Sequence, residues 1–196
     1  MKKLLGLTIC ILALIISACN NTGNRIEDAD SVSEVATEDT AVAFQNDAVW
    51  ANIDFDVPVI VEPDLQDTDI TLRGTDTLSI YSLEQDIMFN TAKAQILPAG
   101  EEKLQKIADS IRKRIGDSKA MIRVYGFTDS RAGKEFNLEL GKERAKAVEA
   151  WLSSQAGFDA SRIQVISLGE KLPEATNETA AGRQQNRRVE IVVVKS

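Results

Sequence analysis

From residue 77 onward, the sequence alternates between segments with a two-residue period and segments with a helical period. This alternation constrains the fold more than any other feature. Strand patterns end at Gln85–Phe89 and recur at 120–127, 163–168 and 188–194, while helical patterns cover 98–115, 134–156 and 180–186. Such an order predicts an α/β (α+β) sandwich of βαβαβ(α)β type, with one mixed sheet and helices packed on one face.

The N-terminus has the pattern of an export signal. Lys2 and Lys3 precede a short apolar run, Leu4–Ile16, that ends in small residues. We expect a signal peptide over 1–18, because the run is too short to span a bilayer comfortably. The sequence ISAC, ending at Cys19, resembles the bacterial lipobox, in which the cysteine is lipidated; an ordinary secretory signal is the alternative. By resemblance to enterobacterial lipoproteins, Asn20 favours the outer membrane, with the folded domain in the periplasm.

Two further segments precede the alternating region. Residues 19–47 are acidic and poor in apolar residues, so we expect a lipid-bearing, disordered tether. Residues 48–76 contain alternating apolar positions from Ile53 to Val61, interrupted by Pro58, which is typical of an edge strand. We interpret 48–76 as a strand-containing extension packed on the main domain, 77–196; a separate binding strand is the alternative.

The composition argues against several classes of function. The chain has no histidine and two cysteines, of which Cys10 leaves with the signal peptide. Most metal sites and catalytic triads are therefore unavailable, and no metal or cofactor is expected. A formal net charge of −7 argues against nucleic acid as a partner.

The helix expected at 134–156 has an unusual polar flank. Asn137 and Arg144 lie on either side of Gly141, on a stripe that should point partly inward. A partly desolvated guanidinium needs an anion, and Asp129 lies in the loop before the helix. The acid and the arginine would suit a ligand that carries both an amine and a carboxylate, above the gap left by Gly141. Alternatively, Asp129 and Arg144 pair with each other, and Gly141 is a close helix contact.

Several motifs in this half of the chain resemble the OmpA-like C-terminal domain family, which includes the peptidoglycan-associated lipoproteins. The resemblance covers roughly 78–195 and rests on these segments: IMFNT at 87–91, YGFTD at 125–129, Asn137, LG at 140–141, RA at 144–145, and NRRVEI at 186–191.

The resemblance implies non-covalent binding of peptidoglycan through the diamino acid of its stem peptide, commonly diaminopimelate. Asp129 and Arg144 would be the main ligand-binding pair, and Asn137 would line the site. Thr128 and Leu140 would shape it, and Arg187 or Arg188 would close it from the last strand. One position departs from the family pattern: Ala132 stands where glycine is usual, so a loop that needs a positive φ there would be strained or shifted.

The function implied is that of an outer-membrane lipoprotein that tethers the membrane to the cell wall without being an enzyme. A module of a larger envelope complex, docking other envelope proteins through 48–76, is one alternative. A periplasmic cell-wall enzyme is the other, since carboxylate pairs are abundant.

Overall fold

The structure, a computed structural model, describes residues 50, 53–66, 68–90, 93–116 and 119–195. The expected signal peptide, Cys19 and the tether to residue 47 lie outside these residues. Within the described part of the chain, no helix has both the length and the apolar character needed to cross a bilayer.

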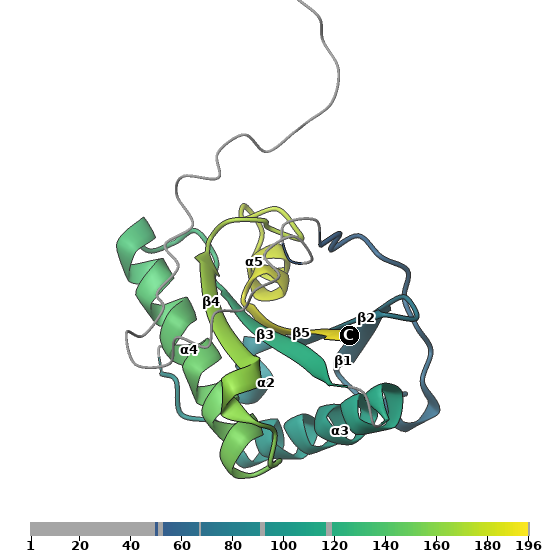
Figure 1. The fold of residues 1–196 in the computed structure, drawn as a ribbon. Helices are drawn as coiled ribbons and strands as arrows, with labels where there is room; N and C mark the ends of the chain where they lie inside the picture. The colour runs from purple at the N-terminus through teal and green to yellow at the C-terminus, as the bar shows by residue number, and fades with distance from the viewer. Residues whose placement is uncertain (1–49, 51–52, 67, 91–92, 117–118, 196) are drawn as a thin grey trace, which may run out of the picture. The chain divides into compact units, whose positions relative to one another are not determined.

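Five strands form a single mixed sheet in the order β1-β2-β5-β3-β4 (Figure 1). They are β1 (Ile70–Gly74), β2 (Leu78–Glu84), β3 (Ala120–Phe127), β4 (Ile163–Gly169) and β5 (Arg188–Lys195). Only β3 and β4 are parallel, and α4 (Lys134–Ser154) connects them; the other neighbours pair antiparallel. The predicted fold class is confirmed.

Two long helices cover one face of the sheet. Helix α3 (Pro98–Ile115) begins at a proline and ends before Gly116, whose φ of 54° suits glycine. The apolar stripes of α3 and α4 pack together on the apolar side chains of one sheet face. Members of this core include Leu104, Ile107 and Ile111 of α3, Val148 and Leu152 of α4, and Ile122, Val124 and Ile191 of the strands. Short helices α2 (Gln85–Met88) and α5 (Ala180–Asn186) and the 3₁₀ turns Pro63–Leu65 and Ala160–Arg162 complete the described elements.

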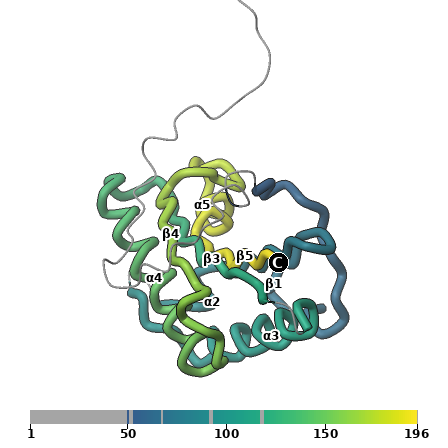
Figure 2. Tube along the Cα trace, in the orientation of Figure 1, coloured from purple at the N-terminus to yellow at the C-terminus, as the bar shows by residue number. Residues whose placement is uncertain are grey.

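Apolar residues between Trp50 and Val57, in the chain that precedes β1, pack on the opposite face of the sheet (Figure 2). Trp50 is buried and lies against the guanidinium of Arg123, 4.3 Å from the ring centroid. The Phe55 ring meets Tyr125 edge-on, with centroids 5.4 Å apart. The described residues of the 48–76 segment therefore pack on the sheet, and β1 is one of its edge strands.

Two predictions about strands were wrong. Gln85–Met88 forms a helical turn after β2, not the end of a strand, because the ladder with β5 stops at Glu84. The alternation from Ile53 to Val61 is not one half-buried strand: Ile53 and Phe55 face inward, whereas Val59 and Val61 are 66% and 72% exposed. The change follows Pro58, where the chain reaches the edge of β1 and forms a single bridge, Val59 to Arg73.

Candidate ligand-binding site

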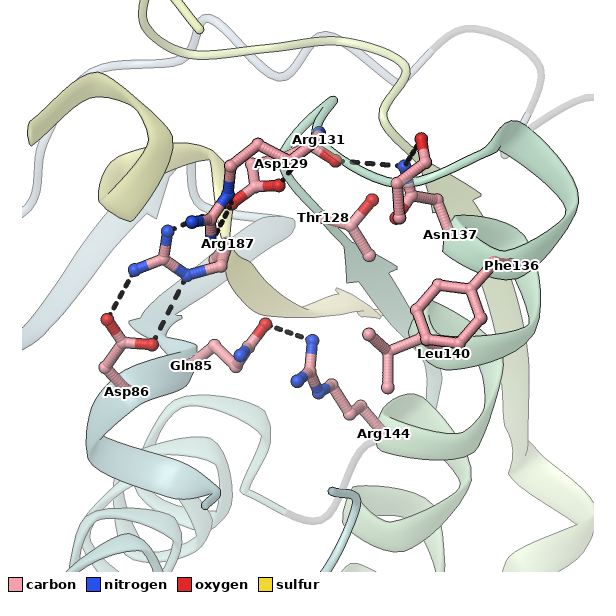
Figure 3. A pocket seen from close by; sticks show the side chains of 11 residues that line it. Gln85, Asp86, Thr128, Asp129, Arg131, Phe136, Asn137, Leu140, Arg144 and Arg187 are labelled. Atoms are coloured by element: carbon pink, nitrogen blue, oxygen red, sulfur yellow. Dashed lines mark hydrogen bonds and ion pairs between the residues drawn. The ribbon is translucent and has the colours of Figure 1, made fainter. Parts of the chain in front are cut away.

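A pocket of about 420 Å³ lies where the loop after β3, the first turns of α4, the α2 turn and the start of β5 meet (Figure 3). The residues that line it are Gln85, Asp86, Thr128, Asp129, Arg131, Ala132, Phe136, Asn137, Leu140, Arg144 and Arg187. Six of the seven residues predicted for the site are thus brought together; the seventh, Arg188, is not among them.

A close contact between two glycines positions α4 on the sheet. A Cβ added to Gly126 would lie 2.0 Å from the Gly141 carbonyl oxygen, and one added to Gly141 would lie 2.6 Å from Ser167 Oγ. Gly141 therefore contacts β3 and β4, and it is not a gap beneath the ligand. The expectation of such a gap was wrong, and the alternative of a helix-packing contact is the one observed.

The loop after β3 is held by side-chain amides. The Asn137 amide, 2% exposed, donates to the carbonyl oxygens of Asp129 and Ala132 at 3.0 and 3.1 Å. Asn177 Oδ1 accepts from the Ser130 backbone N–H at 3.2 Å. Ala132 does not have a positive φ, since Leu172 is the one non-glycine residue with that conformation in the described chain. The loop is therefore unstrained at Ala132, contrary to one of the two outcomes foreseen from the sequence.

Arg144 is a buried cation whose contacts within the described part of the chain are all with neutral groups. It is 2% exposed, and its guanidinium donates to Gln85 Oε1 and, at 3.3 Å, to the Lys93 carbonyl oxygen, while the Phe89 ring lies 5.8 Å away. Burial lowers the pKa of Arg144 to about 10, although the Asp86 and Asp129 carboxylates act in the opposite sense. The group therefore remains charged at neutral pH, and among the described residues no carboxylate pairs with it.

Asp129 is buried but fully paired. Its Oδ1 accepts from the Arg131 backbone N–H at 3.1 Å, and its Oδ2 contacts the guanidinium groups of Arg131 at 3.0 Å and Arg187 at 3.1 Å. Burial alone would raise the pKa of Asp129, but the Arg131 backbone N–H and the two guanidinium groups together lower it below its usual value. The expected alternative, a direct pair between Asp129 and Arg144, is not formed.

Arg187 links this carboxylate to a second one. Its guanidinium contacts Asp86 at 2.5 Å as well as Asp129, and the bond to Asp86 is the main cause that raises the pKa of Arg187. The charges then alternate in the order Asp86, Arg187, Asp129, Arg131 and cancel. Among the described residues that line the pocket, Arg144 remains as the uncompensated charge, so a ligand is expected to place an anionic group beside it.

Arg188 lies on the face of the sheet that is turned away from α3 and α4. It is 4% exposed, stacks on the Phe127 ring at 3.8 Å and pairs with Glu190 at 2.9 Å. Of the two candidate arginines, the structure thus places Arg187 in the pocket and Arg188 among buried partners elsewhere.

Sequence reasoning missed Gln85, Asp86, Arg131 and Phe136. Gln85 and Asp86 reach the pocket because α2 follows a strand that pairs with β5, a contact between distant segments. Phe136 is 57% exposed in the first turn of α4, and its position outside the apolar stripe of that helix was a usable signal.

The domain is therefore a mixed sheet backed by two helices, with a charged pocket at the end of its central strands that has the residues to receive a small ionic ligand. Comparison with known proteins identifies the family. The family model described as OmpA family matches residues 88–187, and the chain belongs to this family.

Individual relatives agree with this assignment. The chain is 34% identical to the "Probable lipoprotein YiaD" of Escherichia coli, and the match covers 66% of this chain and 57% of that protein. It is 37% identical to the "Peptidoglycan-binding protein ArfA" of Mycobacterium tuberculosis, and this match covers 55% of this chain and 32% of that protein. The matches therefore span between 32% and 57% of the length of these relatives. Among solved structures, "The structure of the cell wall anchor of the T6SS from Pseudomonas aeruginosa" superposes with a TM-score of 0.59 at 31% identity, over 68% of this chain and 92% of that one.

Proposed function

We propose that this chain is an outer-membrane lipoprotein that binds the diamino-acid residue of the peptidoglycan stem peptide without a covalent bond. In this proposal the protein has no catalytic role. The lipid on Cys19 holds the outer membrane, residues 20–47 form the tether, and the domain holds the wall from the periplasm. Two kinds of relative support this proposal, since some carry the name lipoprotein and others the name peptidoglycan-binding protein.

The observation that carries the proposal is the isolated charge of Arg144. A buried guanidinium with neutral partners is costly to the fold unless an anion joins it. A ligand carboxylate at Arg144 would supply this anion through a charge-assisted hydrogen bond. Diaminopimelate ends in a carboxylate and an ammonium on the same carbon, so its ammonium would lie toward Asp129. Thr128 Oγ1 is buried in the same pocket and has no hydrogen-bond partner among the residues that the structure describes, so it is a further group that a ligand could reach.

Binding of a free stem tripeptide that ends in diaminopimelate, measured by calorimetry on the full chain in detergent, tests the proposal. We expect Arg144→Gln and Asp129→Asn each to weaken binding about tenfold to a hundredfold, since a charged hydrogen bond contributes about 1.5–3 kcal/mol. Sedimentation with purified sacculi should show the same losses. Wild-type affinity in Arg144→Gln would refute the proposal.

A role within a larger envelope assembly is a second candidate. It is favoured by the similarity to a protein described as the cell wall anchor of a secretion system. The two candidates are compatible, because an anchor must bind the wall as well as its partners. Deleting the covering segment that includes Trp50 and Phe55 and testing for lost partners by pull-down, with sacculus binding as the control, would separate them.

A further inference from the structure

The carboxylate expected to receive the ligand's ammonium is already occupied in the structure. Asp129 Oδ2 accepts from Nε of Arg131 at 3.0 Å, from its terminal nitrogen at 3.0 Å, and from Arg187 at 3.1 Å. Oδ1 accepts from the Arg131 backbone N–H. Each carboxylate oxygen has about two lone pairs, and Oδ2 already receives three donor atoms, so an ammonium that binds Oδ2 must replace one of these donors.

The two guanidinium groups on Asp129 differ in how firmly they are held. The Arg187 side chain is 18% exposed and is also bound to Asp86 through two nitrogens, at 2.5 and 3.3 Å. The Arg131 side chain is 66% exposed, and Asp129 is its one partner among the described residues. Figure 3 shows Arg131 extending over the Asp129 carboxylate at the rim of the pocket. Arg131 is thus the donor that can leave without breaking another contact.

We propose that the Arg131 side chain is an internal competitor for the ammonium position of the ligand. Binding then exchanges one cation for another on Asp129 Oδ2: the Arg131 guanidinium moves into solvent, and the ligand's ammonium takes its place. This inference rests on the proposed function of the pocket and concerns how strongly that pocket selects an amine. The backbone N–H of Arg131 stays on Oδ1 during the exchange, so the loop keeps its position.

The exchange has two consequences. In the absence of ligand, Arg131 keeps the buried Asp129 paired and ionised. In its presence, Arg131 lowers the affinity for amine-bearing ligands by the strength of one exposed ion pair, which is a factor of about two to five. A ligand that binds Arg144 through a carboxylate but lacks the amine has no need to displace Arg131, and it escapes this reduction.

Arg131→Gln tests the exchange, with two probes measured by calorimetry on the full chain in detergent. One probe is the stem tripeptide that ends in diaminopimelate, and the other is its analogue that ends in 2-aminopimelate, which lacks the side-chain amine. We expect Arg131→Gln to bind the first probe about two- to fivefold more tightly than wild type. The second probe should bind equally well or slightly more weakly, because the variant has lost one positive charge.

Lys113→Gln is the matched control. Lys113 is 61% exposed, forms one ion pair with Asp64 at 3.1 Å and does not line the pocket, so its loss removes the same charge without touching Asp129. This variant should bind both probes like wild type. Thermal unfolding of each variant checks that the fold is retained.

The outcomes separate the inference from the function on which it rests. Weaker binding of the diaminopimelate probe by Arg131→Gln would overturn the inference and show that Arg131 contacts the ligand directly. Equal tightening of both probes would also overturn it, because an exchange at Asp129 must depend on the amine. The function itself fails separately, if Arg144→Gln binds the diaminopimelate probe as tightly as wild type.

Discussion

Replacing Arg144 with methionine should separate the binding role of this residue from any structural one. The substitution keeps an unbranched side chain of helix-forming type in α4 and removes the charge. It also removes the hydrogen bonds that the guanidinium donates to Gln85 and to the Lys93 carbonyl oxygen. One of the two acceptors, Gln85 Oε1, lies in the pocket, where water can replace the donor.

The magnitude follows from the pKa of Arg144. Burial lowers this pKa to about 10, more than two units below its usual value, and each unit corresponds to about 1.4 kcal/mol, so the charged form costs the folded state roughly 3 kcal/mol. Because the folded-state pKa lies below the unfolded one, this cost is fully present at neutral pH and declines only as the pH rises through about 10. The two hydrogen bonds that the charged group donates contribute about 1.5 kcal/mol each, so together they offset a cost of this size.

We therefore expect Arg144→Met to leave the free energy of unfolding within about 1.5 kcal/mol of wild type while it abolishes ligand binding. Denaturant unfolding with and without the stem tripeptide measures both effects in one experiment. At a ligand concentration about a hundred times Kd, wild type should gain about 2.7 kcal/mol, and the variant should gain nothing. A variant that loses 3 kcal/mol or more and still gains stability from the ligand would show that Arg144 is a structural anchor.

Three further predictions address the helix contact, the acid and the anchor. Gly141→Leu should unfold the domain or lower its melting temperature by well over 10 °C, because the new side chain would overlap Ser167 and the β3 backbone. Circular dichroism measures this loss. A variant that stays folded and only fails to bind would contradict the prediction. The pKa of Asp129 is lowered, so its carboxylate stays ionised as the pH falls toward its folded-state pKa. Sacculus binding should therefore be constant between about pH 8 and 5 and decline only below about pH 4. A loss of binding centred near pH 6 would implicate another group. Cys19→Ser should abolish detergent partitioning and change the apparent mass of the processed protein, and unchanged membrane fractionation would exclude the lipid anchor.

The sequence predicted elements well where local chemistry marks both their ends. Helix α3 lies between Pro98 and Gly116 as expected, and strand β3 has the predicted bounds. The turn at Gln85–Met88 was missed because four residues are too few to show a helical period. The change of face after Pro58 was missed because the apolar alternation continues through it, while the surface on which the chain packs changes from the sheet face to the edge of β1.

The same distinction between local and long-range contacts applies to the pocket. Asp129, Asn137 and Arg144 belong to one loop and the helix that follows it, so local sequence relates them: helical spacing places Asn137 and Arg144 on one wall, and Asp129 lies in the loop that leads into the helix. The opposite wall depends on how β2 pairs with β5, because the ladder ends at Glu84 opposite Arg188, and the Gln85 backbone N–H then donates to the Arg187 carbonyl oxygen at 2.9 Å.

This register also decides between the two consecutive arginines. Neighbouring residues of a strand point to opposite faces, so shifting β5 by one residue would exchange the positions of Arg187 and Arg188. The observed register is the one that places the apolar side chains of Val189, Ile191 and Val193 under α3 and α4. Arg188 then falls on the opposite face, where Phe127 and Glu190 receive it, and Arg187 is left at the end of the strand beside Asp86 and Asp129. The burial of three β-branched residues in the core thus determines which arginine reaches the pocket, and no local pattern in the run NRR contains that information.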